Sequence, residues 1–104
     1  MSLDFISPKE VLEYIRRGNA VVIDIRSREA FLKGHIPGAV SMPYDTFDEE
    51  AKILGEYEVL ILCCERGSAS LFLGRKLSRK GFHVLSIGGG MDAWRGPMVY
   101  GDAL

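Results

Sequence analysis

Short apolar runs that alternate with helical patterns are the feature that most constrains the fold of this chain. The segments AVVIDI at 20–25, YEVLILC at 57–63 and FHVLSI at 82–87 are rich in branched apolar residues. Such runs are typical of strands that are buried on both faces of a parallel sheet. Helical patterns separate the runs, so the sequence predicts an α/β fold in which helices cover both faces of the sheet.

The two longest helical segments have clear start and stop signals. In residues 6–19, Ser7 is the expected N-cap and Glu10 completes a capping box. In residues 67–81, Gly81 is expected to end the helix. The expected buried positions are Val11, Leu12 and Ile15 in the first helix and Ala69, Phe72, Leu73 and Leu77 in the second.

Shorter elements are expected between these segments. Pro and Gly punctuation bounds them, because both residues interrupt regular structure. The predicted elements are a short helix at 27–34, a brief strand at 39–42, a polar helix or pair of turns at 44–56, and a short helix within 88–97.

Size and charge exclude several classes of function. A chain of 104 residues that is 47% hydrophobic has the size of one domain, which we expect to span residues 1–104. Its 13 basic and 14 acidic residues nearly cancel, so no nucleic-acid partner is expected. No apolar run approaches the roughly 18 residues of a membrane span. The first ten residues do not resemble a secretory signal, so the expected location is cytoplasmic.

The two cysteines of the chain, Cys63 and Cys64, are adjacent. Adjacent cysteines cannot form an ordinary structural disulfide without distorting the peptide between them. The two histidines, His35 and His83, are scattered, so a zinc site is also a poor interpretation. We therefore expect free thiols and no metal site.

Cys64 follows the predicted strand 57–63 and precedes a predicted helix. In open parallel sheets, ligands bind outside the carboxyl ends of the strands, which is where this thiol is expected. Backbone N–H groups at a helix N-terminus stabilise a thiolate. Gly67 permits the backbone conformations that such a loop needs, and Ser68, Ala69 and Ser70 are too small to block an anion. The loop therefore favours chemistry on sulfur or on an oxyanion.

Three segments together resemble the rhodanese family of sulfurtransferases. The sequence CERGSAS at 64–70 is similar to the family's active-site loop, with glycine three positions and serine six positions after the cysteine. DIRSREAFLKGHIPGAVSMP at 24–43 resembles the family's first signature, and GFHVLSIGGGMDAW at 81–94 resembles its closing segment. The resemblance covers nearly the whole chain. It implies a three-layer α/β fold with a central parallel sheet of about five strands and helices on both faces.

The resemblance also implies an activity. Cys64 would take sulfane sulfur from a donor such as thiosulfate or a persulfide, hold it as a persulfide, and pass it to a thiophilic acceptor. The implied substrate-binding loop consists of Glu65, Arg66, Gly67, Ser68, Ala69 and Ser70. No cofactor is implied, and the implied partners are a small-molecule or protein sulfur donor and a thiol acceptor. The sequence defines neither the physiological donor and acceptor nor the oligomeric state.

Two residues of the loop depart from the family pattern. Thiosulfate-using members often carry basic residues where this chain has Glu65 and Ala69. A carboxylate beside the sulfur disfavours both a thiolate and an approaching dianion. Arg66 has two possible roles, binding of the donor or pairing with Glu65. The alternative to an enzyme is therefore a catalytically weak or inactive sulfur carrier or protein-binding module.

Other residues that attract attention have structural interpretations. A cysteine phosphatase or arsenate reductase would need arginine six positions after the cysteine, where this chain has Ser70. The glycines at 88–90 match no phosphate-binding motif and predict close packing or a tight turn near the loop. Expected structural residues are Asp24, Arg26, Glu29 and His35, with Cys63 and Trp94 in the core.

Overall fold

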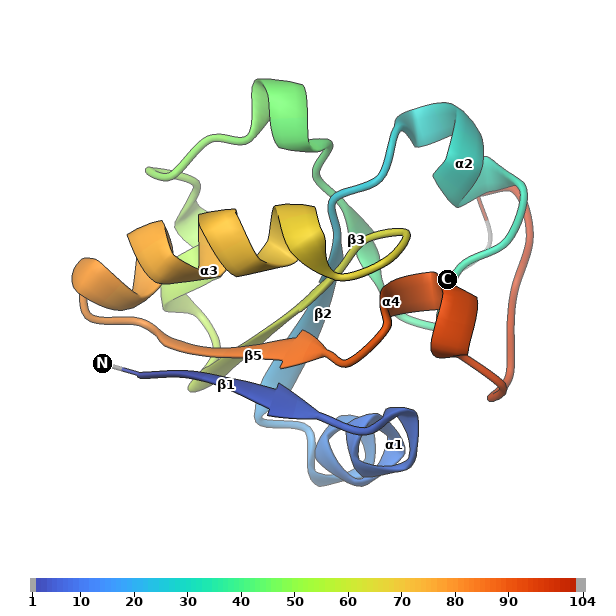
Figure 1. Ribbon diagram of the computed structural model, residues 1–104, viewed down its shortest axis with the longest axis horizontal. Helices are drawn as coiled ribbons and strands as arrows, with labels where there is room; N and C mark the ends of the chain where they lie inside the picture. The colour runs from blue at the N-terminus through green and yellow to red at the C-terminus, as the bar shows by residue number, and fades with distance from the viewer. Residues whose placement is uncertain (1, 103–104) are drawn as a thin grey trace.

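The computed structural model describes residues 2–102, which fold around one parallel sheet (Figure 1). Its strands are β1 (Ser2–Ile6), β2 (Ala20–Asp24), β3 (Val40–Ser41), β4 (Val59–Cys63) and β5 (His83–Ile87). Their order across the sheet is β1-β5-β4-β2-β3, and every neighbouring pair is parallel. The predicted α/β fold with about five parallel strands is confirmed.

Helices cover both faces of the sheet. They are α1 (Pro8–Arg17), α2 (Arg28–Leu32), α3 (Ser68–Arg79) and α4 (Gly90–Ala93), with single 3-10 turns η1 (Tyr44–Thr46) and η2 (Lys52–Gly55). Val11 of α1, Phe31 of α2 and Trp94 after α4 belong to the core on one face. Leu73 and Leu77 of α3 belong to the core on the other face, which η2 also covers. Figure 1 shows α3 and α1 on opposite sides of the sheet, with α4 beyond the end of β5.

The central strand β4 separates the two cysteines. All five of its residues are buried, and successive side chains point to opposite faces of the sheet. Cys63 therefore packs in the core with α1 and α2, whereas Cys64, just beyond the strand, packs on the α3 side. The expected core position of Cys63 is confirmed.

The signals that start and end α1 are those expected from the sequence. The Ser7 Oγ accepts from the Glu10 N–H at 3.3 Å, and the Ser7 N–H donates to Glu10 Oε1 at 2.9 Å. The Ser7 N–H and the Ser7 hydroxyl, whose Oγ lies 3.0 Å from Glu10 Oε1, both donate to the Glu10 carboxylate and lower the pKa of this carboxyl. Gly18 ends the helix with a φ of 78°.

Several expectations about local structure are wrong. Leu12 is 40% exposed and Phe72 is 61% exposed, because both lie toward the outer edge of their helix's apolar stripe. By contrast, the segment 44–56 was expected to form a polar helix or a pair of turns, and the pair of turns is confirmed, since Phe47 and Leu54 pack inward without a continuous helical stripe. Strand β1 was not predicted, because it lies at the sheet edge, where Asp4 and Phe5 are exposed.

Within residues 2–102, none of the helices is both long and apolar enough to cross a membrane.

Candidate active site

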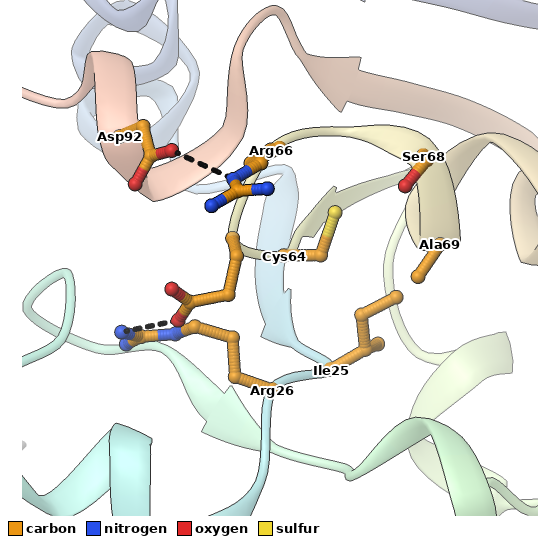
Figure 2. Close-up of a pocket in the computed structure, with 8 residues that line it drawn as sticks. Ile25, Arg26, Cys64, Arg66, Ser68, Ala69 and Asp92 are labelled. Carbon is orange, nitrogen blue, oxygen red and sulfur yellow. Dashed lines mark ion pairs between the residues drawn. The ribbon is translucent and has the colours of Figure 1, made fainter.

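Cys64 lies at the carboxyl end of the central strand, as the sequence predicted, and faces a pocket of about 390 Å³. Cys64 as a whole is 5% exposed, and its side chain lines this pocket. The residues that line the pocket are Ile25, Arg26, Cys64, Glu65, Arg66, Ser68, Ala69 and Asp92 (Figure 2). The pocket therefore combines one thiol, two cations and two carboxylates.

Two groups of the loop contact the sulfur atom. The Gly67 N–H donates a hydrogen bond to Cys64 Sγ at 3.0 Å, and Ser70 Oγ lies 3.5 Å from the same sulfur. Gly67 has a φ of 103°, in the region that favours glycine, and the next residue starts α3. The sulfur thus lies at the N-terminus of a helix of 12 residues, where the helix dipole stabilises negative charge.

The segment after β5 holds the loop from the other side. The Met91 N–H donates to the Cys64 carbonyl at 2.7 Å, and the Asp92 N–H donates to the Glu65 carbonyl at 3.0 Å. These bonds need close backbone approach at Gly90, where an added Cβ would lie 2.4 Å from the Cys64 carbonyl oxygen. Close packing near the loop, one of the two alternatives expected for the glycines at 88–90, is confirmed at Gly90.

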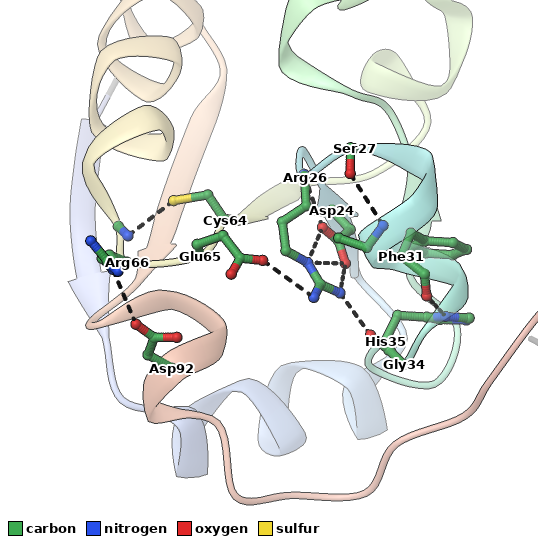
Figure 3. A network of polar contacts seen from close by, with 12 residues as sticks. Asp24, Arg26, Ser27, Phe31, Gly34, His35, Cys64, Glu65, Arg66 and Asp92 are labelled. Carbon is green, nitrogen blue, oxygen red and sulfur yellow. Dashed lines mark hydrogen bonds and ion pairs between the residues drawn. The ribbon is translucent and has the colours of Figure 1, made fainter.

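Arg26 reaches the pocket from the end of β2 (Figure 3). Its guanidinium binds the buried Asp24 carboxylate, with Nη2 2.7 Å from Oδ2, and also donates to the Gly34 carbonyl at 2.7 Å. Its Nη1 lies 3.6 Å from Glu65 Oε1. Burial opposes the charge on Arg26, but the hydrogen bonds and charge of Asp24, with Glu65, outweigh it and raise the arginine pKa. The pocket therefore contains a fixed cation at every physiological pH.

Arg66 forms the second ion pair at the pocket. Its Nε lies 3.5 Å from Asp92 Oδ2, and both side chains are exposed. Of the two roles considered for Arg66, pairing with Glu65 is not observed, because Glu65 faces Arg26 instead (Figure 3). Each of the four charges that line the pocket thus has an opposite charge beside it, and these four charges sum to zero, with the buried Asp24 behind Arg26 in addition.

Sequence reasoning missed Arg26 and Asp92 as residues of the pocket. Arg26, which was expected to be structural, does form an ion pair with Asp24, but it also lines the pocket. Arg26 follows β2 and Asp92 follows β5, the two strands that flank β4. The carboxyl ends of parallel strands meet at one edge of the sheet, so a charged residue after a predicted strand is a signal for a pocket residue. The sequence does not show which strands are neighbours, so this signal could not be used.

The remaining residues are placed as expected. His35 is fully buried, stacks on Phe31 with ring centroids 3.7 Å apart, and does not line the pocket. Trp94 is buried and donates from Nε1 to the Pro97 carbonyl at 3.0 Å. Glu29, by contrast, is exposed on α2, so its expected structural role stays a prediction.

Cys63 differs from Cys64 in its surroundings. Its thiol is fully buried, and this burial, with a contribution from the Asp24 charge, raises the pKa of the Cys63 thiol well above its ordinary value. A protonated, enclosed thiol is a poor nucleophile. Across residues 2–102, no three His, Cys, Asp or Glu side chains come together as metal ligands.

The fold and the pocket define a class of α/β protein that carries one pocket thiol on a loop between a central strand and a helix. Within that class, the rhodanese-like domain family has a sequence model that matches residues 7–97, and the chain belongs to this family.

Two relatives illustrate the similarity. A tRNA sulfurtransferase from Desulfurococcus amylolyticus is 33% identical over 78 residues, which make up 75% of this chain and 15% of that protein. A candidate sulfur carrier protein from Bacillus subtilis, YrkF, is 32% identical over 76 residues, which make up 72% of this chain and 41% of that protein. The chain thus spans less than half the length of these relatives.

Solved structures show the same fold. A thiosulfate sulfurtransferase from Pseudomonas aeruginosa superposes with a TM-score of 0.86 at 25% identity, covering 97% of this chain and 20% of that chain. A rhodanese-related protein from Thermoplasma volcanium superposes with a TM-score of 0.82 at 24% identity, covering 92% of this chain and 97% of that chain.

Proposed function

We propose that this chain is a sulfurtransferase that carries sulfane sulfur as a persulfide on Cys64. The observation that carries the proposal is the hydrogen bond of 3.0 Å from the Gly67 N–H to Cys64 Sγ, at the N-terminus of α3 and inside the pocket. A fixed amide donor and a helix N-terminus stabilise a sulfur anion without a reorganisation cost during the reaction. The sulfurtransferase and sulfur carrier names of the two relatives support the same general chemistry.

The proposed cycle has two displacement steps. In the first, the Cys64 thiolate attacks the outer sulfur of the donor, and the donor's sulfur–sulfur bond breaks. The leaving group keeps the bonding electrons, as sulfite from thiosulfate or as a thiolate from a persulfide. In the second, a thiolate or cyanide attacks the outer sulfur of the persulfide, and Cys64 leaves as a thiolate. The Gly67 N–H contacts the sulfur that is anionic in the thiolate. In the persulfide the charge lies on the outer sulfur, one bond further from Cys64, where we propose that the backbone amides of residues 65–70 stabilise it.

The charges of the pocket favour a donor other than thiosulfate. Arg26 is bound by Asp24 and faces Glu65, and Arg66 is paired with Asp92. A dianion therefore meets two cations that already have carboxylate partners. We propose that a low-molecular-weight or protein persulfide is the better donor. Its charge is smaller than that of thiosulfate, so its binding depends less on attraction by cations that already have carboxylate partners.

Intact-protein mass spectrometry tests the proposed function. The reduced protein is incubated with thiosulfate or with a persulfide donor, and each sample is then treated with cyanide. We expect a gain of one sulfur atom that maps to Cys64 and disappears with cyanide. Failure to gain sulfur from any donor, in a folded protein, would reject the proposed transfer cycle.

Reversing the charge at Glu65 is expected to speed the reaction with thiosulfate. Glu65→Arg replaces a carboxylate at the pocket with a cation, so a dianion is attracted and not repelled. We expect a rise of roughly 3- to 10-fold in kcat/KM at low ionic strength, which shrinks as salt is added. Rates are measured from sulfite release.

A matched variant controls for net charge. Glu56→Arg makes the same change at an exposed residue before the start of β4, at the other end of the strand from Cys64. Glu56→Arg should leave the rate within about twofold of the original, because its charge is distant and screened. An unchanged or slower rate in Glu65→Arg would overturn the electrostatic argument.

The second candidate function is a sulfur carrier or binding module without turnover. The neutralised cations favour it, because a pocket without a free cation attracts an anionic donor weakly. Such a module would accept sulfur from a protein persulfide but would turn over no small-molecule donor. Loading of Cys64 from a persulfide donor without catalytic turnover of thiosulfate would indicate the carrier, and no loading from any donor would indicate the binding module.

A further inference from the structure

A pair of buried hydroxyls lies beside Cys64 but outside the set of residues that line the pocket. Ser70 of α3 and Ser86 of β5 are both 0% exposed. Their Oγ atoms are 2.6 Å apart, and Ser70 Oγ is 3.5 Å from Cys64 Sγ. Ser86 is thus connected to the sulfur through the Ser70 hydroxyl.

The hydrogens of this cluster can be assigned by elimination. Ser70 Oγ lies 3.0 Å from the Gly67 carbonyl oxygen, and a carbonyl can only accept, so Ser70 uses its one hydrogen there. Its two lone pairs then accept from the Cys64 thiol and from Ser86. In this arrangement the Cys64 thiol, the Ser70 hydroxyl and the Ser86 hydroxyl each have an acceptor for their hydrogen.

The opposite direction of the bond between the serines is unfavourable. If Ser70 donated to Ser86, the Gly67 carbonyl would still accept from the Leu71 N–H at 3.2 Å, but the buried Ser86 hydrogen would need another acceptor. Within residues 2–102, Ser70 Oγ is the one hydrogen-bond partner of Ser86 Oγ. A buried donor without an acceptor is costly, so Ser86 donates and Ser70 accepts.

Loss of the thiol proton changes what the sulfur needs. A thiolate no longer donates to Ser70 and instead requires donors, and Ser70 is the hydroxyl within reach. Because Ser86 fills one lone pair of Ser70, the Ser70 hydrogen is directed toward the Gly67 carbonyl or toward the sulfur. Donation from Ser86 also polarises the Ser70 O–H and makes it a stronger donor.

We propose that Ser86 is a positioning residue: it holds the Ser70 hydroxyl as a donor toward the anionic sulfur of Cys64. The role extends the proposed function, on which it rests for its use in sulfur transfer. No proton leaves the two serines in this role. Ser86 acts through Ser70 and does not touch the substrate.

The rate of alkylation of Cys64 by iodoacetamide at neutral pH tests the proposal, because the thiolate is the reacting form. Ser86→Ala should slow alkylation about 3- to 10-fold, since the Ser70 donor is weakened but not lost. Ser86→Thr keeps the hydroxyl and should restore most of the rate. Thermal unfolding of each variant shows that the fold is retained.

Two further variants separate positioning from a structural effect. Ser41→Ala removes another hydroxyl that is buried in the sheet and has no partner among the described residues, so the rate should not change. In a Ser70→Ala background, Ser86→Ala should add less than about twofold, because the residue through which Ser86 acts is absent.

The outcomes decide the proposal. Equal slowing by Ser86→Ala with and without Ser70, or failure of Ser86→Thr to recover the rate in a folded protein, would overturn it. Alkylation does not require a sulfur donor, so it reports on Ser86 even if the protein accepts no sulfur. Sulfur loading of the unmodified protein, measured in parallel, reports separately on the proposed function.

Discussion

Replacing Cys64 by serine is expected to abolish sulfur loading without unfolding the protein. A serine hydroxyl stays protonated at neutral pH and cannot hold sulfur as a persulfide. The side chain is nearly the same size, and the Gly67 N–H that contacts the sulfur can bond to a hydroxyl oxygen instead. The measurement is intact mass after incubation with a persulfide donor, with circular dichroism as the check on folding.

Cys63→Ser is the matched control for this prediction. Cys63 is the neighbouring residue but points into the core on the opposite face of the sheet. Its loading should be close to that of the unmodified protein, although burying a hydroxyl there lowers the free energy of unfolding by about 1 to 3 kcal/mol. Loss of loading in Cys63→Ser, in a protein that stays folded, would show that the nucleophile is Cys63 and that its assignment to Cys64 is wrong.

Gly90→Ala is expected to damage both the stability and the loop that carries Cys64. Gly90 has a φ of 61°, and an added Cβ would lie 2.4 Å from the Cys64 carbonyl oxygen and 2.6 Å from that of Glu65. These are backbone atoms, so the loop or α4 must move. The backbone strain and the overpacking together should lower the free energy of unfolding by about 2 to 4 kcal/mol.

The experiment for Gly90 compares it with a glycine in open space. Gly18 has a φ of 78°, but an added Cβ meets nothing within 4 Å. Gly18→Ala should therefore cost only the backbone strain, about 1 kcal/mol, and should leave sulfur loading intact. Urea denaturation gives the two stabilities. Equal losses in both variants would show that close packing against the loop has no part in the effect of Gly90.

The order of the strands explains why the pocket was only partly predictable. The loop 64–70 is continuous in sequence, so its cysteine, glycine and small residues could be recognised together. Arg26, Asp92 and Ser86 are far from the loop in sequence. They approach it because β2 and β5 flank β4 in the sheet, and hydrophobic periodicity does not encode that order.

The exposure of individual helix residues was also beyond the sequence. The apolar stripes of α1 and α3 were recognised, but Leu12 and Phe72 lie at the exposed side of these helices. Periodicity gives the direction of the buried face to within about one side chain, whereas the width of the contact depends on how each helix sits on the sheet. The edge strand β1 was missed because one-sided pairing imposes little pattern on its residues.

The sequence by itself determined the alternation of strands and helices, the position of Cys64 at a strand end, and the glycine that lets the next loop turn. Each depends on local chemistry: side-chain branching, capping, and backbone freedom at Gly67. Only the tertiary structure decided which charges neutralise the pocket and which hydroxyl lies behind Ser70. Those contacts join residues from different strands, and their distances are set by the packing of the sheet as a whole.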